Sequence, residues 1–311
     1  MILVTGGTGY LGSHITRRLS QNGEQIRVLV RNKEHAQKEN RLKDLDVEWM
    51  EGDVNKPDTL NPIFESIETV IHTVAIAIEK GNVTYEKVNY QGTVNIVEAC
   101  KAAGVKRFIN ISQLGAQSDL PYRFLASKGK AQEYVAASDL DWTAFRPAVI
   151  WGPEDEFANT FAKLIPFSPI IYPIVDKHAQ FQSVWVEDVT TAVVNSIKDS
   201  STYQHEYELG GPETLTLEEI ERRTLQAVGA NRKLVPVPKS FIRAVVVLME
   251  KLLPNPPVTR SLLELLAISN VTKNNAITQF VEHPKPFTPE NTAPYMRQFS
   301  ARQTLSQFFN S

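Results

Sequence analysis

The sequence predicts an α/β protein built around a doubly wound parallel sheet, with a smaller, mostly helical lobe towards its C-terminus. Short apolar runs alternate with helical patterns up to about residue 200, which is typical of parallel strands joined by helices. A cluster of glycines separates the first apolar run from the first helical pattern. Beyond residue 150, prolines accumulate and the alternation weakens, so we expect an excursion towards the second lobe there.

Residues 1–30 predict a strand, a glycine turn, a helix and a second strand. The apolar run at 2–4 suits a strand that is buried on both faces, as in a parallel sheet. Leu11, Ile15 and Leu19 then recur every four residues, as on one face of a helix. A second apolar run begins at residue 26 and completes the unit.

The same alternation continues along the chain. Because ligands of such sheets bind at the carboxyl ends of the strands, the residues that follow each strand are the candidate site. Further strands are predicted at 47–50, 70–74, 107–111, 142–145 and 184–186, and further helices at 89–103, 128–137 and 189–197, the last capped by Asp188.

Three glycines of the first turn, Gly6, Gly9 and Gly12, stand three residues apart after Thr5. Glycine permits tight turns and lets a ligand approach the backbone, and a helix N-terminus attracts phosphate. The pattern therefore predicts a turn that holds a dinucleotide diphosphate, although the spacing differs from the commoner G-x-G-x-x-G. A glycine-rich hairpin without a ligand is the alternative. No Gly-Lys-Ser/Thr follows, which excludes a P-loop.

The end of the second strand predicts which dinucleotide is held. An acidic residue there selects NAD(H), whereas a basic residue accommodates the 2′-phosphate of NADP(H). Arg31 and Lys33 follow the strand, and no Asp or Glu stands at its tip. This charge favours NADP(H) over NAD(H), with a solvated basic loop as the alternative. Asp53, after the third strand, can accept a hydrogen bond from adenine or cap the next helix.

Composition argues against several other functions. The chain has 311 residues and a formal net charge of −2 without a long basic run, so no nucleic-acid partner is expected. Cys100 is the only cysteine, which suits a reducing compartment, and we expect a cytoplasmic protein. The six histidines show no metal-ligand spacing, so no metal is expected. The first strand starts at residue 2, so no signal peptide is expected.

No apolar stretch is long enough to cross a membrane. The longest candidate, 241–253, is interrupted by Arg243, Glu250 and Lys251. We expect an amphipathic helix there that packs on the protein rather than lying on a bilayer. Association with a membrane periphery or with a protein complex stays open.

Several motifs resemble the short-chain dehydrogenase/reductase superfamily, in its extended and atypical, epimerase- and dehydratase-like branches. They are the glycine turn at 5–12, Gly-Asp-Val at 52–54, Val-Asn-Tyr-Gln-Gly-Thr at 88–93, Arg-Pro at 146–147, Gly-Pro at 152–153, Val-Glu-Asp-Val at 186–189 and Gly-Gly-Pro at 210–212. Within the superfamily the chain is most similar to the group that contains the nucleotide-binding accessory subunit of respiratory complex I, and 254–266 is similar to the C-terminal lobe of that group.

The resemblance implies a Rossmann fold that binds NADP(H) or NAD(H). The cofactor domain would span residues 1–200, with an excursion at 151–180 towards the substrate lobe, and 201–311 would form that substrate or partner lobe. His72 and Asn89 would pass near the cofactor and the active site. The cofactor itself would be held by Gly6, Thr8, Gly9, Tyr10, Leu11, Gly12, Arg31, Asp53, Val54, Val74, Lys128 and Pro147.

The superfamily's proton donor is the tyrosine of a Tyr-x-x-x-Lys pair, and this chain departs from that pattern. Lys128 is present, but Phe124 stands where the tyrosine is expected, and phenylalanine carries no transferable proton. Tyr122 can replace the phenol only if residues 120–125 are not yet helical. The serine that polarises the substrate in the family would be Ser112, unless the family position falls on the next residue.

These residues leave three functions open. The first is an NADP(H)-dependent oxidoreductase that acts on a small apolar or quinone-like substrate with a non-standard active site. The second is a non-catalytic NADP(H)-binding sensor, assembly factor or accessory protein, for which the helix at 240–253 could be the docking surface. A nucleotide-sugar epimerase or dehydratase is the weakest of the three, because that chemistry depends on the absent phenol. The fold alone does not establish the chemistry.

Overall fold

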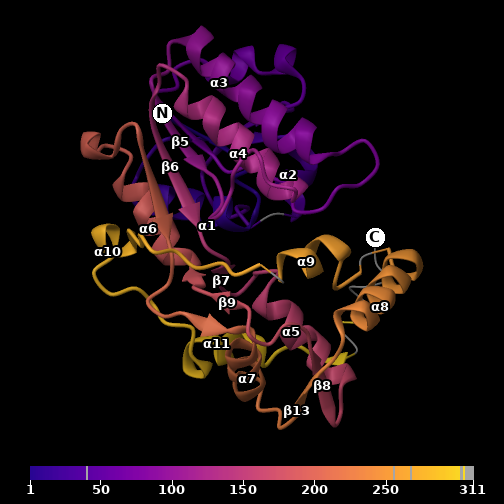
Figure 1. The fold of residues 1–311 in the computed structure, drawn as a ribbon. Helices are drawn as coiled ribbons and strands as arrows, with labels where there is room; N and C mark the ends of the chain where they lie inside the picture. The colour runs from indigo at the N-terminus through magenta and orange to yellow at the C-terminus, as the bar shows by residue number, and fades with distance from the viewer. Residues whose placement is uncertain (40, 255, 267, 302–303, 305–311) are drawn as a thin grey trace. The chain divides into compact units, whose positions relative to one another are not determined.

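The computed structural model describes residues 1–39, 41–254, 256–266, 268–301 and 304 (Figure 1). They divide into two compact units, between which the chain passes repeatedly. The first unit comprises Met1–Pro147, Val186–Leu209 and Asn274–His283, and the second comprises Ala148–Trp185, Gly210–Lys273 and Pro284–Ser311.

The first unit is built on a seven-stranded sheet in the order β11-β6-β5-β4-β1-β2-β3. All neighbouring strands in it are parallel, which confirms the predicted doubly wound architecture. The order reverses between β1 and β4, so ligands are expected at the carboxyl ends of these strands. The strands are β1 Ile2–Thr5, β2 Ile26–Val30, β3 Glu48–Glu51, β4 Thr69–His72, β5 Arg107–Ile111, β6 Asp141–Pro147 and β11 His205–Leu209.

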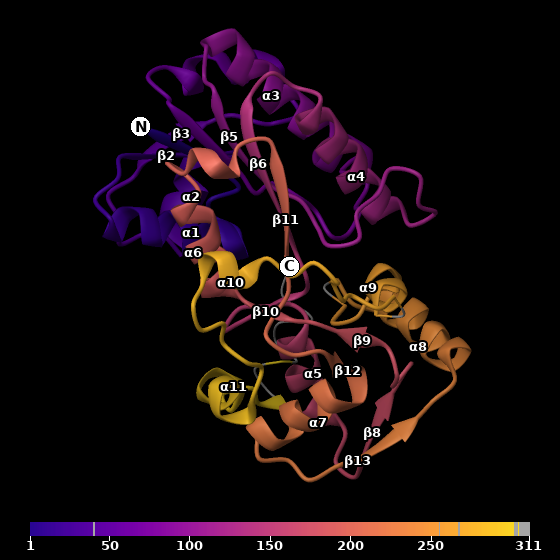
Figure 2. The same cartoon turned by 60° about the vertical axis from the view of Figure 1, so that its left-hand side comes forward.

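Helices cover both faces of this sheet. The two helices α3 and α4 lie side by side in both views, and α1 packs with α6 (Figures 1 and 2). Leu11, Ile15 and Leu19 of α1 are all buried, as their four-residue spacing predicts. The helices of this unit are α1 Tyr10–Gln21, α2 Lys33–Glu39, α3 Gly92–Ala103, α4 Arg123–Ala136, α6 Val186–Asn195 and α10 Ile277–Phe280, with a π-helical turn at Glu86–Gln91 and short 3-10 turns at Pro57–Thr59, Asn61–Phe64 and Ser200–Thr202.

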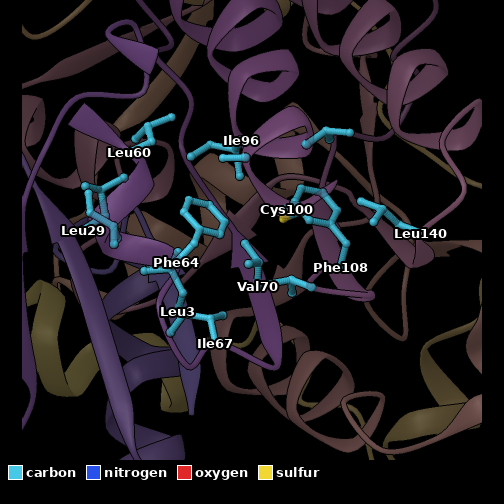
Figure 3. Packing of buried hydrophobic residues seen from close by; sticks show 14 of the residues in the cluster. Leu3, Leu29, Leu60, Phe64, Ile67, Val70, Ile96, Cys100, Phe108 and Leu140 are labelled. Carbon is cyan, nitrogen blue, oxygen red and sulfur yellow. The ribbon is translucent and has the colours of Figure 1, made fainter. Parts of the chain in front are cut away.

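The core on one face of the sheet explains why these elements stay together. Leu3, Val70 and Phe108 from three adjacent strands pack against Ile96 and Cys100 of α3 (Figure 3). Each of these side chains is fully buried. Cys100 is thus a small apolar packing group, and burial raises the pKa of its thiol, so it does not act as a thiolate.

The second unit is made of short two-stranded ribbons and helices around a separate aromatic core. In that core Trp151 packs edge-to-face on Phe287, with ring centroids 5.3 Å apart. The ribbons pair β7 Ile150–Trp151 with β10 Val184–Trp185, β8 Ile171–Ile174 with β13 Lys233–Pro236, and β9 Gln180–Phe181 with β12 Leu215–Thr216. The helices are α5 Ala158–Leu164, α7 Leu217–Ala227, α8 Lys239–Leu252, α9 Arg260–Leu265 and α11 Pro289–Met296, with a 3-10 turn at Ile165–Phe167.

Two helices begin earlier than the sequence predicts. The helix α4 starts at Arg123 rather than at residue 128, since the chain becomes regular two residues after Pro121. The helix α6 starts at Val186, directly after β10. Asp188 therefore lies inside the first turn of α6, where the helix dipole favours a carboxylate, and the prediction that it caps this helix is wrong.

Candidate cofactor and active site

The glycine turn joins β1 to α1 with a backbone that only glycine accommodates. Gly6 has a φ of 77°, and a Cβ there would lie 2.6 Å from the Thr73 Oγ1. A Cβ on Gly12 would lie 2.1 Å from the carbonyl oxygen of Gly6. Both positions therefore need glycine to bring the first turn of α1 against the end of β1.

The outer side of the same turn is open to a ligand. Gly9 is exposed, and the Gly6 carbonyl, 3.1 Å away, is the single atom within contact range of a Cβ added there. Gly9 is also the N-cap of α1, and no side chain in the described part of the chain caps this helix end. Backbone N–H groups at such an end bind phosphate, so the turn fits a dinucleotide diphosphate. Thr8 and Tyr10 flank the opening half-buried, and Leu11 is buried beneath it.

A chain of buried hydrogen bonds lies behind the turn. The Thr5 Oγ1 and the His72 Nδ1 are 2.6 Å apart, and the His72 Nε2 is 3.0 Å from the Thr93 Oγ1. Thr93 donates its own proton to the Asn89 carbonyl over 2.7 Å, so it accepts from the Nε2–H of His72. Burial, with a smaller contribution from Lys128, lowers the pKa of His72 to about 3, so the imidazole is neutral. This series of hydrogen bonds links the glycine turn to the helical turn that carries Asn89.

The tip of β2 carries a basic side chain and an acidic neighbour. Arg31 is exposed and has no ion pair among the described residues. The backbone N–H of Lys33 donates to the Glu51 Oε2 over 3.2 Å. Glu51 belongs to β3, and the sequence prediction considered acidic residues directly after β2 alone, so it missed Glu51. The charge around the expected ribose position is therefore mixed rather than purely basic.

Asp53 lies at the carboxyl end of β3 in a turn of its own. Its Oδ1 accepts the N–H of Asn55 over 2.9 Å, and its own N–H donates to the Thr59 Oγ1 over 3.0 Å. Lys56, not Asp53, occupies the N-cap position of the following 3-10 turn, so the alternative that Asp53 caps this helix is wrong. The neighbouring Val54 is buried under the helix that begins at Gly92.

Lys128 is buried on α4 against the end of β5. Its Nζ donates to the Ile111 carbonyl over 2.6 Å. That is one of its three N–H donors, and the described residues engage no other. Burial lowers the pKa of Lys128 to about 8, so at neutral pH the side chain is an ammonium with donors left for a ligand.

The neighbouring residues of α4 are held by the π-helical turn. The Asn89 Nδ2 donates to the Ser127 Oγ over 3.1 Å, and the Asn89 Oδ1 accepts the N–H of Ile76 over 2.8 Å. The Ser127 hydroxyl donates in turn to the Phe124 carbonyl. A π-helical turn holds one residue more than a turn of α-helix, and such turns are frequent at functional sites. Here the turn fixes the first half of α4, from Phe124 to Lys128.

The residues considered for proton transfer differ in their surroundings. Ser112, directly after β5, has a buried hydroxyl without a hydrogen-bond partner among the described residues. Phe124 packs edge-to-face on Tyr85, with ring centroids 5.7 Å apart. Tyr122 is the extended N-cap of α4 and is 39% exposed, but residues 123–125 are already helical, so the condition under which it could replace the phenol is not met. The described part of the chain provides no hydrogen bond to its phenol.

The remaining predicted residues lie on the same sheet edge. Val74 follows β4, and its backbone nitrogen lies close to Gly6. Pro147 ends β6, and its carbonyl oxygen accepts the N–H of Leu114 over 2.9 Å. All predicted cofactor and catalytic residues thus belong to the first unit, where they follow its strands or lie on α1 and α4. Among the described residues, no group of three His, Cys, Asp or Glu side chains could hold a metal ion.

Comparison with known proteins agrees with this geometry. Residues 6–162, half of the chain, match a family described as NAD(P)H-binding. NADH dehydrogenase (ubiquinone) 1 alpha subcomplex subunit 9 of Arabidopsis thaliana mitochondria is 33% identical over 224 residues, which are 70% of this chain and 55% of that protein. The chain therefore spans about half the length of that relative.

Two further proteins are similar over most of their length. A ceramide reductase of Caulobacter vibrioides is 30% identical over 239 residues, which are 76% of this chain and 74% of the reductase. The NADPH complex of an Escherichia coli NADPH-dependent quinone oxidoreductase has the same fold, with a TM-score of 0.74, 19% identity and coverage of 99% of this chain and 100% of that one. The resemblance carried by the motifs is confirmed, and the chain belongs to the NAD(P)H-binding family.

Proposed function

We propose that the chain is an NADP(H)-dependent oxidoreductase that reduces a small apolar or quinone-like substrate without a tyrosine acid. The observation that carries this proposal is the buried ammonium of Lys128, which has one partner among the described residues, the Ile111 carbonyl. A buried cation with two unused donors is costly unless a ligand engages them. The ribose hydroxyls next to a nicotinamide would do so.

Residues of the first unit would hold the dinucleotide in a defined order. The turn from Gly6 to Gly12 would bind the diphosphate, Lys128 the nicotinamide ribose, and Asp53 the adenine through its remaining carboxylate oxygen. The exposed guanidinium of Arg31 favours NADP(H), because it can pair with the 2′-phosphate through two N–H groups. Glu51 opposes this preference by its charge, so some NAD(H) binding is expected as well.

The absence of a phenol at position 124 restricts the substrate class. When bound, NADPH supplies a hydride. Reduction of a quinone consumes that hydride and one proton, giving NADP⁺ and the hydroquinone. The negative charge of the anion formed first is delocalised, so water can protonate it without a dedicated acid. The free hydroxyl of Ser112 would donate a hydrogen bond to the substrate oxygen as this charge develops.

The ceramide reductase among the relatives supports a reductase, and it supports an apolar substrate. We assign the role of a substrate lobe to those parts of 201–311, and of the excursion at 151–180, that belong to the second unit. The single buried thiol of Cys100 suits a reducing compartment such as the cytoplasm.

A second candidate function is a non-catalytic NADP(H)-binding accessory or assembly protein. It is favoured by Phe124, which fills the tyrosine position with a ring packed on Tyr85, and by the mitochondrial subunit among the relatives. An epimerase or dehydratase is less well supported, because Phe124 cannot exchange a proton and Tyr122 is an exposed N-cap.

The test has two stages. Titration with NADPH and NADH would measure both affinities for the wild type, for Arg31→Glu and for the control Lys38→Glu, whose exposed partner is Glu34. NADPH binding that Arg31→Glu loses, and the control keeps, supports the cofactor assignment. Absence of binding to either dinucleotide would contradict it.

The second stage follows NADPH oxidation with a panel of quinones. The proposal predicts turnover that Ser112→Ala lowers mainly through kcat, since this hydroxyl would act on the developing charge. If NADPH binds but no quinone, flavin or carbonyl compound is reduced, and Phe124→Tyr is also inactive, the accessory function replaces the reductase.

A further inference from the structure

Three large apolar side chains are exposed among the described residues of the first unit, and all three border the candidate site. They are Ile78, Val83 and Tyr122, which are 49%, 39% and 39% exposed. Ile78 and Val83 belong to the segment that follows β4, and Tyr122 is the N-cap of α4. We call these three residues the apolar rim. A single exposed apolar residue is ordinary, whereas several at one site mark a surface that binds something apolar.

The second unit also exposes apolar side chains, on α8. Phe241, Leu248 and Leu252 of this helix are each more than half exposed, and Val246 is its one buried residue. The expectation that α8 packs on the protein is therefore contradicted along its exposed side, and nothing in the structure shows what covers that side. No helix in the described part of the chain has both the length and the apolar character needed to span a membrane.

The segment from residue 73 to 85 connects the two sides of the candidate site. It starts at the carboxyl end of β4, where the strand order reverses. At its start the Thr73 hydroxyl donates to the carbonyl of Thr5, directly before the glycine turn, over 2.9 Å. At its end the Tyr85 ring packs on Phe124 of α4. The segment therefore runs from the turn that would hold the diphosphate to the helix that would hold the ribose.

Two pairs of polar contacts hold this segment in place. The Asn89 Oδ1 accepts the N–H of Ile76 over 2.8 Å, and the Asn89 Nδ2 donates to the Ile76 carbonyl over 3.2 Å. The Arg123 guanidinium binds both carboxylate oxygens of Glu79, over 2.7 and 2.9 Å. Asn89 also donates to the Ser127 hydroxyl, so one side chain joins the segment to α4.

The tip of the segment is a tight turn with its own hydrogen bonds. Lys80 and Val83 exchange two backbone N–H···O bonds of 3.0 Å, and Gly81 between them has a φ of 57°. The backbone that presents Val83 is thus ordered before any ligand arrives. Contact with a preorganised side chain costs little ordering entropy, which favours binding.

The ion pair brings the remaining two residues of the apolar rim towards each other. Ile78 directly precedes Glu79, and Tyr122 directly precedes Arg123. The two charges of the pair neutralise one another, so they offer little attraction to a charged ligand. The rim therefore fits an apolar group better than a nucleotide-sugar.

We infer that the apolar rim binds the alkyl tail of a substrate whose quinone ring is reduced at the candidate site. This inference deepens the proposed function and rests on it. The rim is continuous with that site, because Asn89 contacts both the segment and the helix that carries Lys128. A protein partner would need about 800 Å² on each side, far more than three side chains less than half exposed supply.

The test compares two quinones that share one ring. The tailless probe is 2,3-dimethoxy-5-methyl-1,4-benzoquinone, and the tailed probe carries a ten-carbon alkyl tail on the same ring. Equilibrium dialysis of the full chain with NADP⁺ gives both Kd values without turnover. The tail should lower the Kd about tenfold or more. Ile78→Ser should raise the Kd of the tailed quinone about fivefold and Val83→Ser about threefold, because each loses burial of its exposed part. Neither should change the Kd of the tailless quinone.

Val47→Ser is the matched control for Val83→Ser. Val47 is a half-buried valine directly before β3, at the amino ends of the strands and away from the candidate site, so this variant should keep both Kd values. The inference is overturned if the wild type does not bind the tailed quinone more tightly than the tailless one. It is also overturned if Ile78→Ser and Val83→Ser leave the Kd of the tailed quinone unchanged, or if Val47→Ser raises it as much.

Replacing NADP⁺ by NADPH in the same samples tests the proposed function separately. A tailed quinone that binds through the rim but is not reduced contradicts the reductase and leaves the rim assigned. A quinone that is reduced equally well with and without its tail supports the reductase and contradicts the rim.

Discussion

Among single residues, Lys128 has the surroundings that most directly test cofactor binding. Replacing it by methionine keeps the apolar stem but removes the donors, so Lys128→Met should raise the Kd for NADPH about tenfold or more, as for a lost charge-assisted hydrogen bond. Fluorescence titration measures this. Lys130→Met is the control, because Lys130 lies two residues away on α4 and pairs on the surface with Glu86. Unchanged affinity in Lys128→Met would contradict a ribose-binding role.

The pKa of Lys128 gives the same assignment a pH dependence. Burial lowers it to about 8, so the free protein loses the ammonium as the pH rises through that value. The neutral amine is the weaker donor, and NADPH affinity should therefore fall between pH 7 and pH 9. Titrations across this range should show no such fall in Lys128→Met. A fall of equal size in both proteins would place the titrating group elsewhere.

Two glycines of the turn should respond differently to one added methyl group. Gly9 has an ordinary φ of −72°, and a Cβ added there would lie 3.1 Å from the Gly6 carbonyl oxygen, so Gly9→Ala should fold with a small loss of stability and lose NADPH affinity, because the turn that would hold the diphosphate has to shift. Gly12→Ala puts a carbon 2.1 Å from the Gly6 carbonyl and should lower the melting temperature itself. Thermal unfolding and titration of both variants separate the two effects. Equal stability of both variants would contradict the geometry of the turn.

At the scale of elements, predictability follows the length and the regularity of the pattern. The strands at 26–30 and 107–111 are rich in apolar residues, and the apolar residues of α1 recur every four positions; the structure has these elements as predicted. The start of α4 was harder to predict from the sequence, since 123–127 show no helical spacing of apolar residues. Phe124 packs there on Tyr85, which lies far earlier in the chain. Glu51 reaches the tip of β2 only through strand pairing, which no local pattern encodes.

The helix α7 contains a buried carboxyl whose effect on the stability of the folded state can be measured. Glu221 is 4% exposed, its Oε2 has no partner among the described residues, and burial raises its pKa to about 9. The folded state keeps this proton where the unfolded state, with a pKa of 4.5, loses it. Stability should therefore decrease as the pH rises from about 4.5 towards 9.

Glu221→Gln removes this proton linkage and should stabilise the protein at pH 7 by about 3 kcal/mol. At pH 4 it should have little effect, because both states then hold the proton. Thermal unfolding at the two pH values measures the difference. Glu34→Gln serves as the control, since Glu34 lies on α2 and pairs on the surface with Lys38. A gain of the same size at both pH values would show that folding does not raise the pKa of this carboxyl.

For the whole molecule, the division into two units predicts which parts of the protein bound NADPH protects from hydrogen exchange. All predicted cofactor residues lie in Met1–Pro147, so NADPH should stabilise the first unit directly. At a ligand concentration of about 100 times Kd the stabilisation is about 2.7 kcal/mol, which slows globally exchanging amides about a hundredfold. Hydrogen exchange should then slow in β1, in α1 and in the first half of α4. The ribbon of β8 and β13 in the second unit should exchange at its original rate. Equal protection of that ribbon would mean that the two units unfold together, and protection of that ribbon alone would place the dinucleotide outside the glycine turn.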